Sequence, residues 1–266
     1  MGADRLRSLF AGAAERGTTV LLPFMTAGLP DPAHSVAVFE SMAAAGADGF
    51  EVGIPYTDPL MDGPVIQRGS DTAIARGATL AVSLDLVGQV SSSTGRPVLA
   101  MTYVNPVLRR GIDEFCGALS DQGADGLIVP DLPVEEATPF LQAARRHDLG
   151  MVLFAAPTST DERIRRVAEA GPVFIYAVAE MGVTGERRQA GGKIAELSER
   201  IRRITDIPVV AGVGISTPDQ ARTAAAHVDG VIVGSALVRR VLDAQTPEAA
   251  ADAAGGAVRE LAAALH

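Results

Sequence analysis

Short apolar runs alternate along the chain with longer segments in which apolar residues recur at helical spacing. Most of the short runs are continuous, which is typical of parallel strands buried on both faces. The eight runs are Val20–Phe24, Gly49–Gly53, Pro97–Tyr103, Gly126–Val129, Met151–Phe154, Val173–Val178, Pro208–Gly212 and Gly230–Gly234. Eight strand–helix units predict an α/β fold, a (β/α)8 TIM barrel, and a doubly wound open sheet is the alternative.

Capping patterns mark where several helical segments begin. Thr217-Pro218 and Thr246-Pro247 each place a capping hydroxyl before a proline at the first helical position. Ser159–Glu162 has the spacing of a capping box. These starts support the regular alternation of strands and helices.

Each end of the chain carries a segment that is expected to form a helix in addition to the eight strand–helix units. Asp4–Arg16 is amphipathic, with Leu6, Leu9 and Phe10 on one face, so we expect an extra N-terminal helix that covers the bottom of the barrel. The alanine-rich segment Glu248–His266 is expected to form a final covering helix, although two glycines interrupt it.

The segment between the second and third runs is unusually long. It extends from Ile54 to Arg96 and reads as an elaborated Pro/Gly-rich loop followed by about two helices. Long loops after barrel strands usually serve the active site. The chain has 266 residues and no evident linker. Since a barrel needs about 250 residues, residues 1–266 are expected to form one domain.

Composition narrows the classes of partner. The formal net charge is −9, which argues against nucleic acid, because binding to its phosphates needs a clustered basic surface. A small phosphorylated ligand remains open, since backbone amides can hold it. Cys116 is the only cysteine, and no run approaches the ~20 apolar residues of a membrane helix. We expect a cytoplasmic protein that binds no membrane.

Carboxylates follow the second strand, at the barrel end where active sites lie. Glu51 stands within the apolar run near its C-terminal end, and Asp58 and Asp62 lie on the loop that follows. Burial would raise the pKa of Glu51 and suit it to proton transfer near neutrality. In the alternative interpretation, Glu51 pairs with a core cation and the aspartates cap turns.

Glycines follow the last three strands, in Gly182–Gly185, at Gly214 and at Gly234. Glycine lets backbone amides approach an anion, and the helix that begins after Ser235 adds its partial positive charge. A single glycine loop could simply relieve a tight turn, but three such loops favour a phosphate site. Phosphate sites recur at the last loops of barrels.

Several other kinds of chemistry have no matching motif. The four histidines show no metal-ligand spacing with one another or with Cys116. Lys193 is the only lysine, and it does not end a strand, as a Schiff-base lysine would. If the chain cleaves a carbon–carbon bond, we therefore expect acid–base chemistry rather than an imine.

Seven motifs together resemble one family, the tryptophan synthase α subunit, in order and across nearly the whole chain. They are Pro23–Gly28, Phe50–Pro55, Asp58–Pro64, Tyr103–Pro106, Asp131–Pro133, Gly182–Gly185 and Val233–Ser235. The block from Glu51 to Gly63 is the most specific of them. The resemblance implies a lyase of tryptophan biosynthesis that splits indole-3-glycerol phosphate into indole and glyceraldehyde 3-phosphate by a retro-aldol reaction.

The resemblance also implies roles for individual residues. Glu51 would be the general acid and base, and Asp62 would stabilise the indole N1–H. Phe24, Met101 and Ile128 would line the indole pocket, with Tyr176 near the substrate. The phosphate would be held by Thr184, Gly185, Gly214, Gly234 and Ser235.

The family further implies a partner, a β subunit that carries pyridoxal phosphate, in an α2β2 assembly. Asp58, Pro59 and Pro133 match positions expected at that interface. No metal or organic cofactor is implied for the α reaction itself.

The chain departs from the family pattern at Ala179-Glu180, in Glu186–Gly192 and at Val213. These departures motivate two alternatives: a free-standing lyase that releases indole, and a non-catalytic regulatory subunit that binds a phosphate ligand and activates a β partner. A third alternative is another phosphosugar barrel, such as an isomerase. Intact Glu51 and Asp62 favour the lyase.

Overall fold

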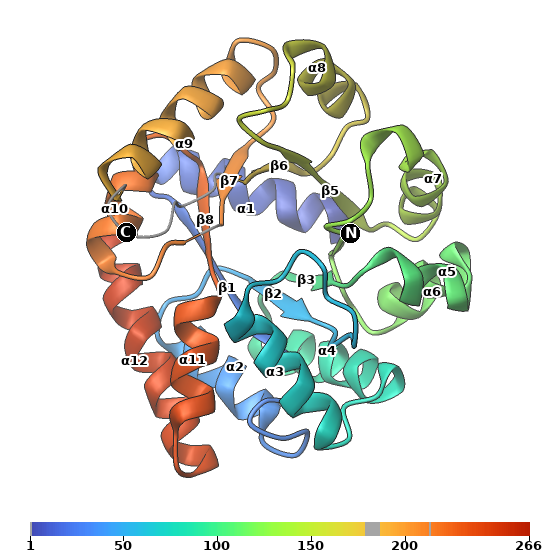
Figure 1. Ribbon diagram of the computed structural model, residues 1–266, viewed down its shortest axis with the longest axis vertical. Helices are drawn as coiled ribbons and strands as arrows, with labels where there is room; N and C mark the ends of the chain where they lie inside the picture. The colour runs from blue at the N-terminus through green and yellow to red at the C-terminus, as the bar shows by residue number, and fades with distance from the viewer. Residues whose placement is uncertain (1, 179–186, 213) are drawn as a thin grey trace.

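Eight parallel strands close into a barrel in chain order in the computed structural model, which describes residues 2–178, 187–212 and 214–266 (Figure 1). The strands are β1 (Val20–Thr26), β2 (Phe50–Gly53), β3 (Val98–Met101), β4 (Gly126–Ile128), β5 (Gly150–Ala155), β6 (Phe174–Ala177), β7 (Val209–Ala211) and β8 (Gly230–Val233). Strand β8 pairs with β1, so the predicted barrel is confirmed and the open sheet is wrong.

Helices surround the strands as an outer layer (Figure 1). They are α1 (Gly2–Arg16), α2 (Ser35–Ala44), α3 (Pro64–Ala75), α4 (Leu80–Thr94), α5 (Val104–Arg110), α6 (Ile112–Asp121), η1 (Val134–Glu136), α7 (Thr138–Arg146), α8 (Asp161–Glu169), α9 (Arg187–Arg202), α10 (Pro218–Ala225), α11 (Ser235–Asp243) and α12 (Pro247–Leu265). As predicted, the Thr217 and Thr246 hydroxyls cap α10 and α12. At α8 the capping hydroxyl is that of Thr160.

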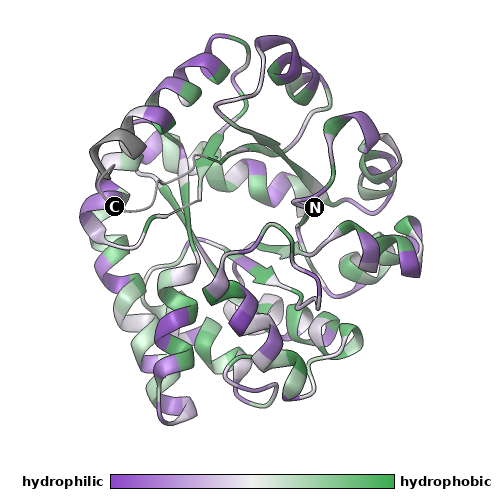
Figure 2. Ribbon diagram, in the orientation of Figure 1, coloured by the Kyte–Doolittle hydropathy of each residue, from purple (hydrophilic) through white to green (hydrophobic). Residues whose placement is uncertain are grey.

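Almost every strand residue is buried, which explains why the runs are apolar without alternation. One set of side chains fills the barrel interior, and the other packs under the helices. Figure 2 shows hydrophobic residues along the strands and hydrophilic residues on much of the helical layer.

Helix α1 closes the end of the barrel at which the strands begin, as expected from its apolar face. Leu6 is fully buried and packs against the first residues of β4 and β5, Gly126 and Gly150, where a Cβ would lie 3.1 and 3.2 Å from its Cδ1 atom. Phe10 contacts Phe174 of β6, with ring centroids 5.6 Å apart. The helix therefore belongs to the core.

We expect Leu6→Ala to lower the free energy of unfolding by about 2–5 kcal/mol, because it opens a cavity beneath the barrel. Leu9→Ala, on the same helix but only half-buried, should cost less than half as much. Urea unfolding followed by circular dichroism measures both. Equal losses would show that α1 does not seal the core.

The long segment after β2 contains two helices, as predicted, and α3 follows directly on the loop that holds Asp62. No single helix in the described residues is long and apolar enough to cross a membrane, although α3 and α4 pass that test as a pair bent by 106°. The final helix α12 is continuous through its glycines. A Cβ at Gly255 would overlap Ser41 of α2, so the glycine lets these two helices approach closely.

Candidate active site

A cavity of about 840 Å³ opens at the end of the barrel where the strands finish. Residues from the ends of β1, β2, β3, β5, β6, β7 and β8 reach its wall. Eight of the predicted site residues line it: Phe24, Glu51, Asp62, Met101, Tyr176, Gly214, Gly234 and Ser235. The structure thus brings into one chamber most of the residues that the sequence singled out.

Glu51 projects into this cavity from β2, opposite Phe24 of β1 in the strand register. The residue is only 3% exposed, and its Oε2 atom has no hydrogen-bond partner in the described chain. Burial, and to a smaller extent the negative charge of Asp62, raises the pKa of Glu51 to about 8. No core cation pairs with it among the described residues, so the structural alternative for Glu51 is wrong.

Asp62 reaches the cavity from the loop between β2 and α3. Burial raises the pKa of Asp62 to about 6, while a hydrogen bond from the Tyr103 hydroxyl moderates the rise. The same hydroxyl accepts the Met61 backbone N–H at 3.1 Å, and Gln67 Nε2 donates to the Asp62 carbonyl at 2.8 Å. Tyr103 is itself buried, so it ties this loop to the barrel.

The two carboxyl groups therefore hold different charges at neutral pH. With a pKa of about 8, Glu51 carries a proton, whereas Asp62, with a pKa of about 6, is ionised. A pair of titratable groups with separated pKa values can divide the roles of acid and anion. The site offers a proton donor and a fixed negative charge in one largely apolar chamber.

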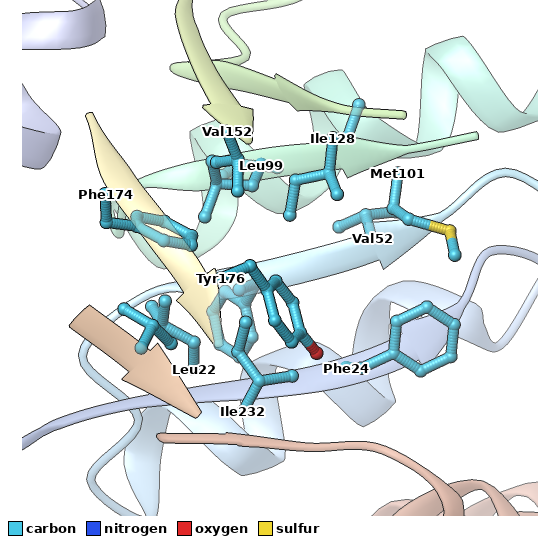
Figure 3. Close-up of a cluster of buried hydrophobic side chains, with 14 of the residues drawn as sticks. Leu22, Phe24, Val52, Leu99, Met101, Ile128, Val152, Phe174, Tyr176 and Ile232 are labelled. Atoms are coloured by element: carbon cyan, nitrogen blue, oxygen red, sulfur yellow. The ribbon is translucent and has the colours of Figure 1, made fainter. Parts of the chain in front are cut away.

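Apolar side chains form much of the cavity wall, and Figure 3 shows three of them, Phe24, Met101 and Tyr176, within a cluster of buried hydrophobic side chains. Phe24, Met101 and Tyr176 lie there as predicted, and Tyr176 stacks on Phe154 with ring centroids 5.1 Å apart. Ile128 is the exception, because it is fully buried in the barrel interior and does not line the cavity. Phe154, at the end of the neighbouring strand β5, lines the cavity instead.

The position of the Tyr176 ring depends on Gly212, which directly follows β7. A Cβ at Gly212 would overlap the Tyr176 hydroxyl, so only glycine leaves room for the ring in this orientation. Burial and the nearby carboxylates of Glu51 and Asp62 raise the pKa of Tyr176 well above its usual range. The hydroxyl is therefore neutral and can act only as a hydrogen-bonding group.

The predicted anion site lies at the loops after β7 and β8. Gly214 has a φ of +81°, a left-handed conformation that favours glycine. Helix α11 begins at Ser235 with Gly234 as its N-cap, and no side chain caps it. The Leu237 and Val238 amides donate to the Gly234 carbonyl, which leaves the amides of Ser235 and Ala236 to face a ligand at the positive end of the helix dipole.

The remaining predicted residues lie elsewhere. Thr184 and Gly185 fall outside the described residues, as do Ala179-Glu180, Glu186 and Val213. Asp58 and Pro133 are exposed and Pro59 is half-buried, and none of the three lines the cavity. Leu60 beside them is 78% exposed, so this loop presents apolar surface to solvent.

Sequence reasoning missed several residues of the cavity wall: Phe154, Arg163, Ser216, Ile232 and Arg239. Phe154 ends the fifth apolar run, so the rule that barrel sites lie at strand ends could have found it. Arg239 follows Ser235 by four residues, which places both on one helix face. The sequence carries no comparable signal for Arg163, which comes from α8.

Comparison with known proteins agrees with this geometry. The family model of the tryptophan synthase alpha chain matches residues 10–266. The tryptophan synthase alpha chain of Salinispora tropica is 45% identical over 262 residues, covering 98% of this chain and 96% of the relative. That of a Picosynechococcus species is 43% identical over 240 residues, covering 90% and 89%.

Solved structures give the same result. A chain of Mycobacterium tuberculosis tryptophan synthase superposes with a TM-score of 0.89 at 39% identity, covering 98% of each chain. The tryptophan synthase subunit alpha of Legionella pneumophila superposes with a TM-score of 0.89 at 30% identity, covering 98% of this chain and 97% of that one. This chain belongs to the tryptophan synthase alpha chain family.

Proposed function

We propose that this chain cleaves indole-3-glycerol phosphate to indole and glyceraldehyde 3-phosphate, as a lyase of tryptophan biosynthesis, in the cavity at the end of the barrel. One observation carries the assignment of roles. A protonated Glu51 and an ionised Asp62 face one apolar chamber, which also contains an uncapped helix N-terminus. Membership of the family supports the substrate and the reaction.

The reaction begins with protonation of the indole ring at C3. Glu51 carries the proton that this step needs, and its Oε2 atom has no partner in the described chain that would compete for it. Protonation makes C3 tetrahedral and leaves positive charge on the indolenine nitrogen. The Asp62 carboxylate stabilises that charge through the N1–H, so it acts in the transition state more strongly than in the ground state.

Cleavage then returns the electrons to the ring. The Glu51 carboxylate accepts the proton of the hydroxyl on the carbon attached to C3. The carbon–carbon bond breaks, its electron pair restores neutral indole, and the carbinol carbon becomes the aldehyde of glyceraldehyde 3-phosphate. Glu51 regains its proton in this step, so the cycle closes without a net proton change. We infer that proton transfer suffices and that the reaction needs no metal or organic cofactor.

The apolar wall and the loops after β7 and β8 would orient the substrate. Phe24, Met101 and Phe154 offer an apolar surface to the indole ring. The phosphate would lie at Gly214, Gly234 and Ser235, where the first-turn amides of α11 donate. Binding both ends of the substrate holds the reacting bond between Glu51 and Asp62.

The two pKa values predict a bell-shaped dependence of kcat/KM on pH. As pH falls through about 6, Asp62 is protonated and loses the charge that stabilises the indolenine. As pH rises through about 8, Glu51 loses the proton it must donate to C3. We therefore expect a maximum near pH 7, measured as indole release from pH 5 to pH 9. A profile that stays flat across both limbs would contradict this division of roles.

The family implies a β subunit as partner, and we propose that the loop with Asp58 and Pro59, together with Pro133, faces it. All three lie outside the cavity, and exposed Leu60 adds apolar surface to the loop. An α2β2 assembly, pyridoxal phosphate on the β subunit and a cytoplasmic location remain predictions. Sedimentation of the mixed subunits tests the stoichiometry.

Indole release from indole-3-glycerol phosphate, with and without a β subunit, tests the proposal. The chain contains no tryptophan, so indole fluorescence would rise over a low background. Slow release alone and much faster release with β would establish a coupled α subunit, whereas fast release alone indicates a free-standing lyase. Binding without release under either condition would leave a regulatory subunit, and isomerisation of a phosphosugar without indole would indicate another barrel enzyme.

A further inference from the structure

Two arginines belong to the described wall of the cavity, and they differ in their partners. Arg163 donates to Glu135 Oε2 at 3.1 Å, in an ion pair. Arg239 forms no hydrogen bond or ion pair within the described chain. A guanidinium at a cavity wall without a carboxylate partner is available to an anionic ligand, and its planar donors match phosphate oxygens.

Arg239 lies on α11 one helical turn after Ser235, which belongs to the proposed phosphate site. Ser235, Ala236 and Arg239 all line the cavity, and Arg239 follows Ala236 by three residues and Ser235 by four, the spacings that place side chains on one face of a helix. One helical turn, about 5.4 Å, separates Arg239 from the first-turn amides. An arginine side chain is long enough to bridge that distance to an anion held by the amides.

The charges of the site leave a role for this cation. Of the two carboxyl groups of the described wall, Glu51 is protonated and Asp62 is negatively charged at neutral pH, and the whole chain has a net charge of −9. A helix N-terminus supplies only about half a positive charge. A phosphate dianion therefore needs a further positive group, and Arg239 is the cation of the described wall that pairs with no carboxylate of the described residues.

We propose that Arg239 binds the phosphate group of the substrate together with the first turn of α11, and that it selects phosphorylated over unphosphorylated substrates. The inference rests on the proposed function and adds to it a side chain that the family motifs did not indicate. Arg239 contacts the phosphate, away from the bond that breaks, so it contributes to substrate binding rather than to proton transfer.

The test compares Arg239→Gln with Arg240→Gln, which changes the neighbouring exposed arginine of α11 that does not line the cavity. Arg239→Gln should raise KM for indole-3-glycerol phosphate roughly tenfold, the scale of one charge-assisted hydrogen bond, with kcat within about twofold. Calorimetry should show a similar loss of affinity for sn-glycerol 3-phosphate and none for indole. Arg239→Lys should recover part of the loss, and Arg240→Gln should change none of these quantities.

Equal effects of the two glutamine variants would overturn the proposal. So would an equal loss of affinity for indole and for glycerol 3-phosphate, because that result indicates a structural change of the cavity. If the unmodified chain released no indole but bound glycerol 3-phosphate in a manner that depends on Arg239, the lyase function would fail and the role of Arg239 would stand. Absence of any glycerol 3-phosphate binding would remove both the site and the proposal.

Discussion

Glu51→Gln is expected to lower the turnover of indole-3-glycerol phosphate at least ~100-fold, the usual scale for a positioned proton-transfer group. Glutamine has nearly the shape of protonated glutamic acid, but it can neither donate the proton to C3 nor accept one from the hydroxyl. Steady-state kinetics of indole release measure the loss. KM should change little, because Glu51 acts on the reacting atoms more than on substrate binding.

Stability provides the control for this variant. Because burial raises the pKa of Glu51 to about 8 in the folded chain, the folded state holds the proton more tightly than the unfolded state does. The free energy of unfolding therefore falls as pH rises from the usual glutamate range to about 8. Glutamine cannot ionise, so Glu51→Gln should be at least as stable as the unmodified chain at pH 8. An inactive variant that is also less stable at that pH would leave the catalytic role unsupported.

Asp62→Asn is expected to have a comparable effect, again at least ~100-fold on kcat. The amide removes the negative charge that stabilises the indolenine, and it leaves the proton donor Glu51 in place. The variant should also lose the acidic limb of the pH profile, because that limb is assigned to Asp62. The same kinetic assay, repeated from pH 5 to pH 9, measures both effects.

Asp71→Asn provides a matched control for Asp62→Asn, because Asp71 is exposed on α3, does not line the cavity and carries the same change of charge. Near-normal turnover in Asp62→Asn would remove its assigned role. Persistence of the acidic limb in that variant would assign the limb to another group. A loss in Asp71→Asn as large as that in Asp62→Asn would show that charge alone, and not the place of the carboxylate, is responsible.

The motifs of the sequence predicted the barrel and most of the chamber because both depend on local order along the chain. Continuous apolar runs are needed for strands buried on both faces, and all eight became strands of the barrel. In a parallel barrel, every strand ends at the same rim. The barrel fold alone therefore predicts that residues at strand ends, such as Glu51 and Gly234, lie close together.

The sequence predicted the individual residues that line the chamber less well than it predicted the barrel. Ile128 and Phe154 both belong to apolar strand ends, yet only Phe154 reaches the cavity. Arg163 and Arg239 come from helices, and their side chains reach the cavity through the packing of those helices on the barrel. Strand register and helix packing decide which side chains reach the cavity, and the spacing of residues along one strand predicts neither.

By itself the sequence determined the strand–helix repeat, the family and the carboxylates and glycines that carry its motifs, whereas the pairing of β8 with β1 decided between a closed barrel and an open sheet. Only the tertiary structure decided the direction of Glu51, its lack of a cation partner in the described chain and the order of the two pKa values. The physical reason is that a pKa depends on burial and on charges brought together from distant segments. Those distances exist only after the barrel has closed and the loop with Asp62 has folded against Tyr103.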